Sequence, residues 1–287
     1  MFFKLIKYYL QKQRINLQIH YALLTGGGFI LGMIKENINP LEINYFKFLL
    51  SIIIILIAFY SSLTFNDVYD FEADLKSGKI TPLTENIIDR KNYIIYGFFL
   101  MSISLILSLL LGFHALFTLF LLHILQIFYS VPPFRFKRLF PISVILLAIA
   151  ALLSCLFGFS VIEKEKFLTN FPLKLYLIFF LAFPFAMNFR DVLDLKGDKI
   201  QGIKTLAVIV GEKKAPLFGG ISLFITYLLV ALILSKPVFF LLSIIAGILS
   251  ITFSLRKNYD ETPLFIVYFL YLIIFIILIY FNPEYLF

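Results

Sequence analysis

Two acidic stretches carry the residue types in this chain that are best suited to chemistry. The first reads NDVYDFEAD over residues 66–74. Within it, Asn66, Asp70 and Asp74 are spaced i, i+4 and i+8, so they share one stripe of a helix. Asp67 lies beside that stripe. Amide and carboxylate oxygens are the ligands that Mg²⁺ and Mn²⁺ prefer, so this stripe predicts a site for a hard cation.

The second acidic stretch has the same character. It reads DVLDLKGD over residues 191–198, and Asp191, Asp194 and Asp198 again share one helical stripe at i, i+3 and i+7. Because Mg²⁺ prefers to be shared with substrate phosphates, two such rows facing each other would hold a diphosphate through bridging metal. Ordinary solvated loops would also contain acids, but two matching rows at the ends of apolar segments favour a site.

Basic residues surround both acidic rows. They fall after the first row, in YSVPPFRFKR at residues 129–138, and around the second row. Each of them could contact diphosphate oxygens or could anchor the chain near anionic lipid. The candidates for diphosphate binding are Lys79, Arg135, Lys137, Arg190 and Lys204.

Composition places these rows in a membrane protein. Of the 287 residues, 61% are hydrophobic and only 15% are charged, and the mean hydropathy is +0.96. A soluble domain carries about 25% charged residues. We therefore expect one polytopic membrane domain over 1–287, with a basic surface segment at 1–14. Its surroundings are membrane lipid, and we expect neither nucleic acid nor an obligate protein partner.

Nine apolar segments are long enough to cross a bilayer, which takes about 20 residues. They cover residues 15–34, 48–65, both halves of 92–134, 139–162, 167–189, 215–235, 237–255 and 262–283. We expect the long stretch to break near Gly112. The sequence thus predicts an all-α membrane protein whose nine transmembrane helices form a bundle around a central cavity, capped by short loop helices.

With nine spans, the motif loops at 66–91, 131–138 and 188–214 share one face of the membrane. Most of the Lys and Arg residues fall on that face. The positive-inside rule then makes it cytoplasmic. We expect the plasma membrane of a prokaryote.

The motifs together resemble those of the UbiA-type intramembrane prenyltransferases. NDVYDFEAD fits the first motif of that family, NDxxDxxxD. DVLDLKGD followed by GIKTLAVIVG resembles the second motif, DxxxD, and the segment after it, and YSVPPFRFKR resembles the connection between spans four and five. The resemblance covers nearly the whole chain. It implies a Mg²⁺-dependent transfer of a prenyl chain from an isoprenyl diphosphate to a lipophilic acceptor.

The resemblance also implies roles for individual residues. The implied ligands of two Mg²⁺ ions, which Mn²⁺ could replace, are Asn66, Asp67, Asp70, Asp74, Asp191, Asp194 and Asp198. The implied catalytic residues are Asp70, Asp74, Asp194, Asp198 and the pocket-lining Tyr129. One position departs from the family, because Thr81 stands where Arg is usual. One diphosphate contact is then missing or is supplied by Arg135 or Lys204.

The implied reaction ionises an allylic C–O bond, and its cation needs shielding from water and stabilisation by aromatic faces. We expect an aromatic or quinone-type acceptor. The alternatives are a glycerol phosphate lipid, a polyene or, in a different class, a divalent-cation transporter, since intramembrane acids mark ion paths. We expect a structural role for His123 and close helix packing at glycines 26–28.

Overall fold

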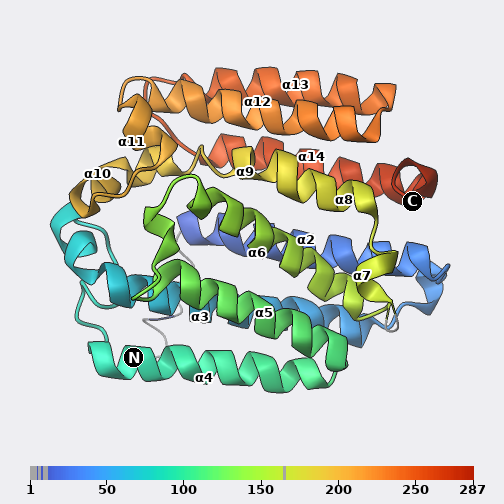
Figure 1. Cartoon of the computed structure of the whole chain (residues 1–287), viewed down its shortest axis with the longest axis horizontal. Helices are drawn as coiled ribbons and strands as arrows, with labels where there is room; N and C mark the ends of the chain where they lie inside the picture. Colours follow the sequence, from blue (N-terminus) through green and yellow to red (C-terminus); the bar gives the residue numbers. More distant parts are fainter. Residues whose placement is uncertain (1–4, 6–7, 9–11, 164–165) are drawn as a thin grey trace. The chain divides into compact units, whose positions relative to one another are not determined.

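The computed structural model describes Leu5, Tyr8 and residues 12–163 and 166–287 (Figure 1). Most of the surface segment predicted at 1–14 lies outside the described residues. The chain forms two compact units, each described by itself. Unit 1 is Met1–Phe136 with Leu153–Phe171, and unit 2 is Lys137–Leu152 with Pro172–Phe287.

All regular structure in the described ranges is helical. Unit 1 contains α2 (Lys12–Lys35), η1 (Pro40–Glu42), α3 (Tyr45–Ser77), α4 (Arg90–Leu109), α5 (Phe113–Ser130) and α7 (Phe167–Asn170). The chain passes between the units in η2 (Phe136–Arg138) and α6 (Ile142–Ser160). Unit 2 contains α8 (Leu173–Leu177), η3 (Ile178–Ala182), α9 (Phe183–Ala186), α10 (Asp191–Gln201), α11 (Leu206–Val210), α12 (Ala215–Leu234), α13 (Pro237–Ser254), α14 (Thr262–Phe281) and η4 (Pro283–Tyr285).

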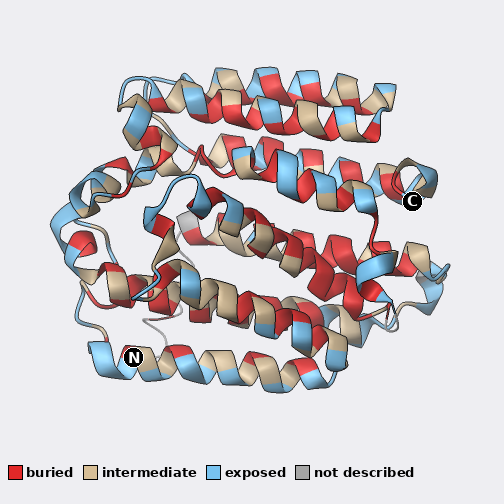
Figure 2. Cartoon of the chain, viewed as in Figure 1, coloured by how far each residue is buried: buried red, intermediate tan, exposed pale blue. Residues whose placement is uncertain are grey.

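Among the described residues, eight helices are long and apolar enough to cross a membrane. The segment Leu173–Ala186 together with α10 makes nine if this bent pair counts as one span. Both α4 and α13 carry exposed residues along much of their length (Figure 2). The exposed side chains of α4 include Ile95, Phe98 and Ile106, which suit a lipid surface. The predicted all-helical membrane fold is confirmed.

The break predicted in 92–134 is present. α4 ends at Leu109 and α5 begins at Phe113, and Gly112 between them has a φ of 125°. A side chain is strongly disfavoured at such a φ, so glycine is the residue that permits this tight connection.

The helix α3 extends well past the apolar segment predicted at 48–65. It runs for 33 residues and ends at Gly78, whose N–H bonds the carbonyls of Asp74 and Leu75 in a left-handed cap. The first acidic row is therefore a direct continuation of a membrane helix. It is not a loop, and the helical stripe predicted for it is present.

The sixth span predicted at 167–189 is not one continuous helix, although Leu173–Ala186 forms part of a bent span if it is counted together with α10. Proline has no N–H to donate, and this segment contains Pro172 and Pro184. The chain is interrupted between α7 and α8, and α8, the π-helical turn η3 and α9 then follow without a gap over Leu173–Ala186. A bend of 72° then separates Leu173–Ala186 from α10. The second acidic row consequently lies on its own short helix.

Close packing at the glycine stretch is confirmed within unit 1. A Cβ added at Gly28 would lie 1.9 Å from the carbonyl oxygen of Cys155, and one at Gly158 would lie 1.9 Å from that of Thr25. The Thr25 hydroxyl donates to the carbonyl of Ser154 at 3.1 Å. α2 and α6 therefore cross with their backbones in contact.

Candidate functional site

The first acidic row lies on the C-terminal third of α3. Asp70 and Asp74 are buried, and Asn66 is half-buried. Ser130, the last residue of α5, donates from its hydroxyl to Oδ1 of Asn66 at 3.4 Å. The three members of the stripe thus offer amide and carboxylate oxygens along one side of a helix. This donor set fits Mg²⁺ or Mn²⁺.

Two of the predicted diphosphate-binding cations lie on this row. Arg135 donates from Nη2 to Oδ1 of Asp70 at 2.6 Å and to the carbonyl of Tyr69 at 2.8 Å. Nζ of Lys79 is 3.9 Å from Oδ1 of Asp74. Arg135 adopts a φ of 42°, which few non-glycine residues do. The loop after α5 therefore presents its guanidinium to the carboxylates of α3.

Asp67 has different neighbours. Its side chain is fully buried, and Arg14 donates from Nη2 to Oδ1 at 3.0 Å. The hydroxyls of Tyr8 and Tyr93 donate to Oδ2 at 2.9 and 3.2 Å. Sequence reasoning missed these three donors, since each is remote from the motif along the chain. A buried carboxylate needs a charged partner, but the sequence alone does not say which cation supplies it.

The departure at Thr81 has a structural explanation. Thr81 is fully buried, and its hydroxyl accepts a hydrogen bond from the N–H of Thr84 at 3.1 Å. The N–H of Thr81 in turn donates to the Thr84 hydroxyl at 2.8 Å. This reciprocal pair closes the turn after α3. An arginine at this position would have to leave the turn or disrupt it.

The second acidic row occupies α10 in unit 2. Asp191 and Asp194 lie in its first turn, where the helix dipole favours negative charge. Asp198 accepts from the Thr205 hydroxyl at 3.3 Å. The turn ahead of α10 is held by Tyr259, whose hydroxyl donates to the carbonyl of Phe189. Burial raises the pKa of Tyr259, so it stays a neutral donor at physiological pH.

The other predicted site residues lie on several elements. Arg190 directly precedes α10, and Lys204 is exposed between α10 and α11. Lys137 is buried in η2, and Tyr129 is half-buried at the end of α5. Within the described part of the chain, no three His, Cys, Asp or Glu side chains form a group that could hold a metal. The convergence of the two rows on shared metal ions stays a prediction.

A buried polar cluster fits the structural role expected of His123. Its Nε2 lies 2.8 Å from the Ser104 hydroxyl, and its Nδ1 lies 3.2 Å from Oε1 of Gln126. Both ring nitrogens are thereby used within the pair formed by α4 and α5. A satisfied histidine of this kind links two helices in an apolar setting.

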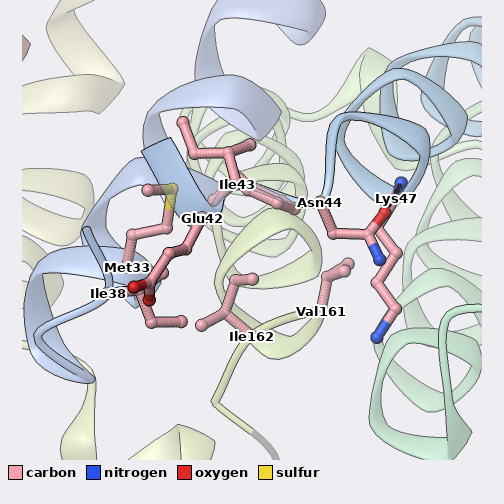
Figure 3. A pocket seen from close by; sticks show the side chains of 9 residues that line it. Met33, Ile38, Glu42, Ile43, Asn44, Lys47, Val161 and Ile162 are labelled. Atoms are coloured by element: carbon pink, nitrogen blue, oxygen red, sulfur yellow. Dashed lines mark hydrogen bonds between the residues drawn. The ribbon is translucent and has the colours of Figure 1, made fainter. Parts of the chain in front are cut away.

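A cavity of about 240 Å³ lies in unit 1, near the start of α3 (Figure 3). Its lining includes Met33, Ile38, Val161 and Ile162, and Glu42 and Lys47 lie on different sides of it. Lys47 precedes Asp70 by 23 residues, which is about 35 Å along a helix. The cavity is therefore separate from the first acidic row.

Comparison with known families gives one match that covers most of the chain. The profile of the UbiA prenyltransferase family matches residues 29–273. Among curated proteins, the chain is 27% identical over 208 residues to the digeranylgeranylglyceryl phosphate synthase of Methanosphaera stadtmanae, covering 71% of this chain and 73% of that protein. It is 27% identical over 209 residues to the synthase of the same name from Pyrococcus horikoshii, covering 72% of each.

The fold also matches solved structures. A UbiA homologue from Archaeoglobus fulgidus bound to DMAPP and Mg²⁺ superposes with a TM-score of 0.68 at 21% identity, covering 95% of this chain and 99% of the homologue. The same homologue bound to GPP and Mg²⁺ gives a TM-score of 0.68. At this level of identity, these likenesses establish the fold.

Proposed function

We propose that this chain, which belongs to the UbiA prenyltransferase family, transfers a prenyl chain from an isoprenyl diphosphate to a glycerol phosphate lipid. The chain is a multi-pass integral membrane protein and a prenyltransferase. The proposed acceptor is carried by one observation, the shared name of the relatives, digeranylgeranylglyceryl phosphate synthase. Those relatives support the glycerol phosphate alternative and give no support to the aromatic or quinone-type acceptor that we expected.

The first acidic row would supply one metal site. Asn66, Asp70 and Asp74 would hold Mg²⁺, and Asp191, Asp194 and Asp198 would hold a second ion. Bound Mg²⁺ would neutralise the negative charge of the diphosphate leaving group. One homologue of the same fold has been solved with Mg²⁺ and each of two prenyl diphosphates, DMAPP and GPP, which supports this cofactor.

The basic residues that lie on or near the rows would bind diphosphate directly. Arg135 and Lys79 contact the carboxylates of Asp70 and Asp74, which supports the proposal that both cations would bind the oxygens of a metal-bound diphosphate. Charge-assisted hydrogen bonds of this kind are roughly twice as strong as neutral ones. Lys137, Arg190 and Lys204 are proposed as further contacts.

The reaction breaks the C–O bond at C1 of the prenyl chain, and its electron pair leaves with the diphosphate. A hydroxyl oxygen of the acceptor then bonds to C1 and loses its proton. Aromatic side chains such as Tyr129 would face the transient allylic cation and shield it from water. Because both substrates have a polar end and a lipid-soluble end, a site at the end of membrane helices suits them.

The orientation follows from charge. We propose that the motif loops face the cytoplasm of a prokaryotic cell, because Lys and Arg residues concentrate on that side. Both substrates would then reach the rows from the cytoplasmic leaflet of the plasma membrane.

The experiment that tests this proposal gives purified enzyme geranylgeranyl diphosphate, Mg²⁺ and competing acceptors. We expect product from geranylgeranylglyceryl phosphate and none from 4-hydroxybenzoate. Asp70→Asn and Asp194→Asn should each abolish turnover. Glu72→Gln is the matched control, because Glu72 is an exposed acid on α3 that lies off the stripe. Preferential prenylation of the aromatic acid would overturn the proposed acceptor.

The transporter alternative has its own measurement. Protein in liposomes loaded with a Mg²⁺ indicator should show no flux above empty liposomes. Mg²⁺ flux without release of diphosphate would indicate a transporter and would contradict the proposed enzyme.

A further inference from the structure

We infer that Asp67 is an anchor rather than a metal ligand, and that Arg14 and Tyr8 fix the rotation of the first acidic row through it. The inference rests on the proposed function, because the row must bind metal for its rotation to matter. It assigns positioning roles to Arg14, Tyr8 and Tyr93, to which the motif gives none.

The hydrogen bonds of Asp67 are the first evidence for an anchor. Oδ1 accepts from Arg14, and Oδ2 accepts from the hydroxyls of Tyr8 and Tyr93. All three donors lie within 3.2 Å, and the side chain of Asp67 is 0% exposed. A metal bound to this carboxylate would have to displace donors that are themselves largely buried. Both carboxylate oxygens of Asp67 are therefore already used by donors from the N-terminal segment and from α4.

The cluster is also tied together without Asp67. The guanidinium carbon of Arg14 lies 4.0 Å from the ring centroid of Tyr8, a cation–π contact. Tyr8 and Tyr93 belong to one buried apolar cluster with Leu5, Val68 and Ile88. An ion pair, a cation–π contact and apolar packing thus all lie on one side of α3.

Helical geometry gives this flank its importance. At about 100° per residue, Asp67 projects about 60° away from the middle of the stripe formed by Asn66, Asp70 and Asp74. Contacts at that angle resist rotation of α3 about its axis in either direction. The best-attested role of a buried ion pair is to fix the register of packed elements. This ion pair would fix the rotation of α3 and thus the direction in which the row faces.

Four variants test the inference: Arg14→Met, Asp67→Asn, the double variant and the control Arg256→Met, which removes an exposed arginine outside the cluster. The readout is Mn²⁺ affinity, measured by electron paramagnetic resonance with an unreactive prenyl thiolodiphosphate present. Loss of an outer contact to a metal site typically costs about 10- to 100-fold in affinity. We expect about a 10-fold loss for each single variant, no greater loss for the double variant, and wild-type affinity for the control.

The anchor role also predicts the kinetics. At saturating Mg²⁺, Arg14→Met should regain most of the wild-type kcat, because the ligands remain and only their orientation is relaxed. A variant that was merely less stable would lower the melting temperature without raising the Mg²⁺ concentration needed for half-maximal activity.

Two results would overturn the inference. One is wild-type Mn²⁺ affinity in Arg14→Met. The other is a loss from Asp67→Asn that is equally large with and without Arg14, as a true ligand would give. Tyr8→Phe and Tyr93→Phe remove one hydroxyl each and keep the test decisive should Arg14→Met not fold. We expect losses of about 2- to 5-fold from these milder changes.

Asp70→Asn separates this inference from the proposed function. If Asp70→Asn loses Mn²⁺ binding while Arg14→Met retains it, only the anchor is disproved. If Asp70→Asn binds Mn²⁺ like the wild type, the metal row itself is disproved.

Discussion

Nη2 of Arg135 lies 2.6 Å from Oδ1 of Asp70, so a cation predicted to bind diphosphate is paired with a carboxylate predicted to bind metal. The two residues are 65 positions apart and come from α3 and from the loop after α5. Their contact brings opposite charges to one surface, as a site for a metal–diphosphate complex requires. It also makes Arg135 the most informative basic residue to change.

Arg135→Ala should raise the KM for geranylgeranyl diphosphate by about 10- to 100-fold, because a hydrogen bond to a charged group contributes about 1.5–3 kcal/mol. Arg135→Lys should recover part of this loss, since it keeps the charge and loses the second N–H donor. Steady-state kinetics with varied diphosphate checks both values. An unchanged KM in Arg135→Ala would remove this residue from the binding site.

Gly28→Ala should destabilise the protein by about 1–3 kcal/mol, the usual cost of overpacking. The added Cβ would meet the carbonyl oxygen of Cys155, and backbone atoms cannot rotate away as a side chain can. Gly26→Ala is the matched control, because its Cβ would lie 3.6 Å from the ring of Phe48, an ordinary contact. Thermal unfolding in detergent compares the two, and equal melting temperatures would contradict the close crossing of α2 and α6.

Thr81→Arg should not improve diphosphate binding, although arginine is usual in the family. The side chain of Thr81 is buried and paired with Thr84, so the larger residue should lower the melting temperature and leave the KM unimproved. Thr81→Ser keeps the hydroxyl and should behave like the wild type. A lower KM in Thr81→Arg would show that the turn can open to admit a further cation.

Asp89 should make the stability of α4 depend on pH. Its carboxylate accepts from the backbone N–H of Asn92 at 3.0 Å, and this bond lowers the pKa of Asp89 below 3.8. A lowered pKa stabilises the folded state above the unfolded pKa, and the contribution disappears as the pH falls through the folded value. The melting temperatures of the wild type and Asp89→Ala should therefore differ at pH 7 and converge once the pH falls below the lowered pKa of Asp89. A difference that stays constant with pH would contradict this cap.

Much of the fold could be predicted because local patterns decide it. Apolar runs of the right length marked the spans, and Gly112 marked the turn between α4 and α5. The helical stripe of Asn66, Asp70 and Asp74 followed from spacing alone. The error at 167–189 came from counting apolar residues without weighing Pro172 and Pro184, which remove backbone donors.

The partners of the acidic residues could not be predicted. Asp67 looked like one more metal ligand, yet its donors come from Tyr8, Arg14 and Tyr93. Such pairings depend on tertiary packing, and spacing within a motif holds no information about them. The contact between Lys79 and Asp74 could have been predicted from the sequence, because Lys79 follows Asp74 by five residues and a turn brings it back toward this aspartate.

The uninterrupted length of α3 has a mechanical consequence. Its 33 residues span about 50 Å, whereas the hydrocarbon core of a bilayer is about 30 Å thick. A single rigid rod therefore joins the lipid-embedded part of the protein to Asp70 and Asp74. Any tilt that α3 takes up in a thinner or thicker bilayer would move those carboxylates with it, so catalytic competence would be sensitive to the thickness of the host membrane.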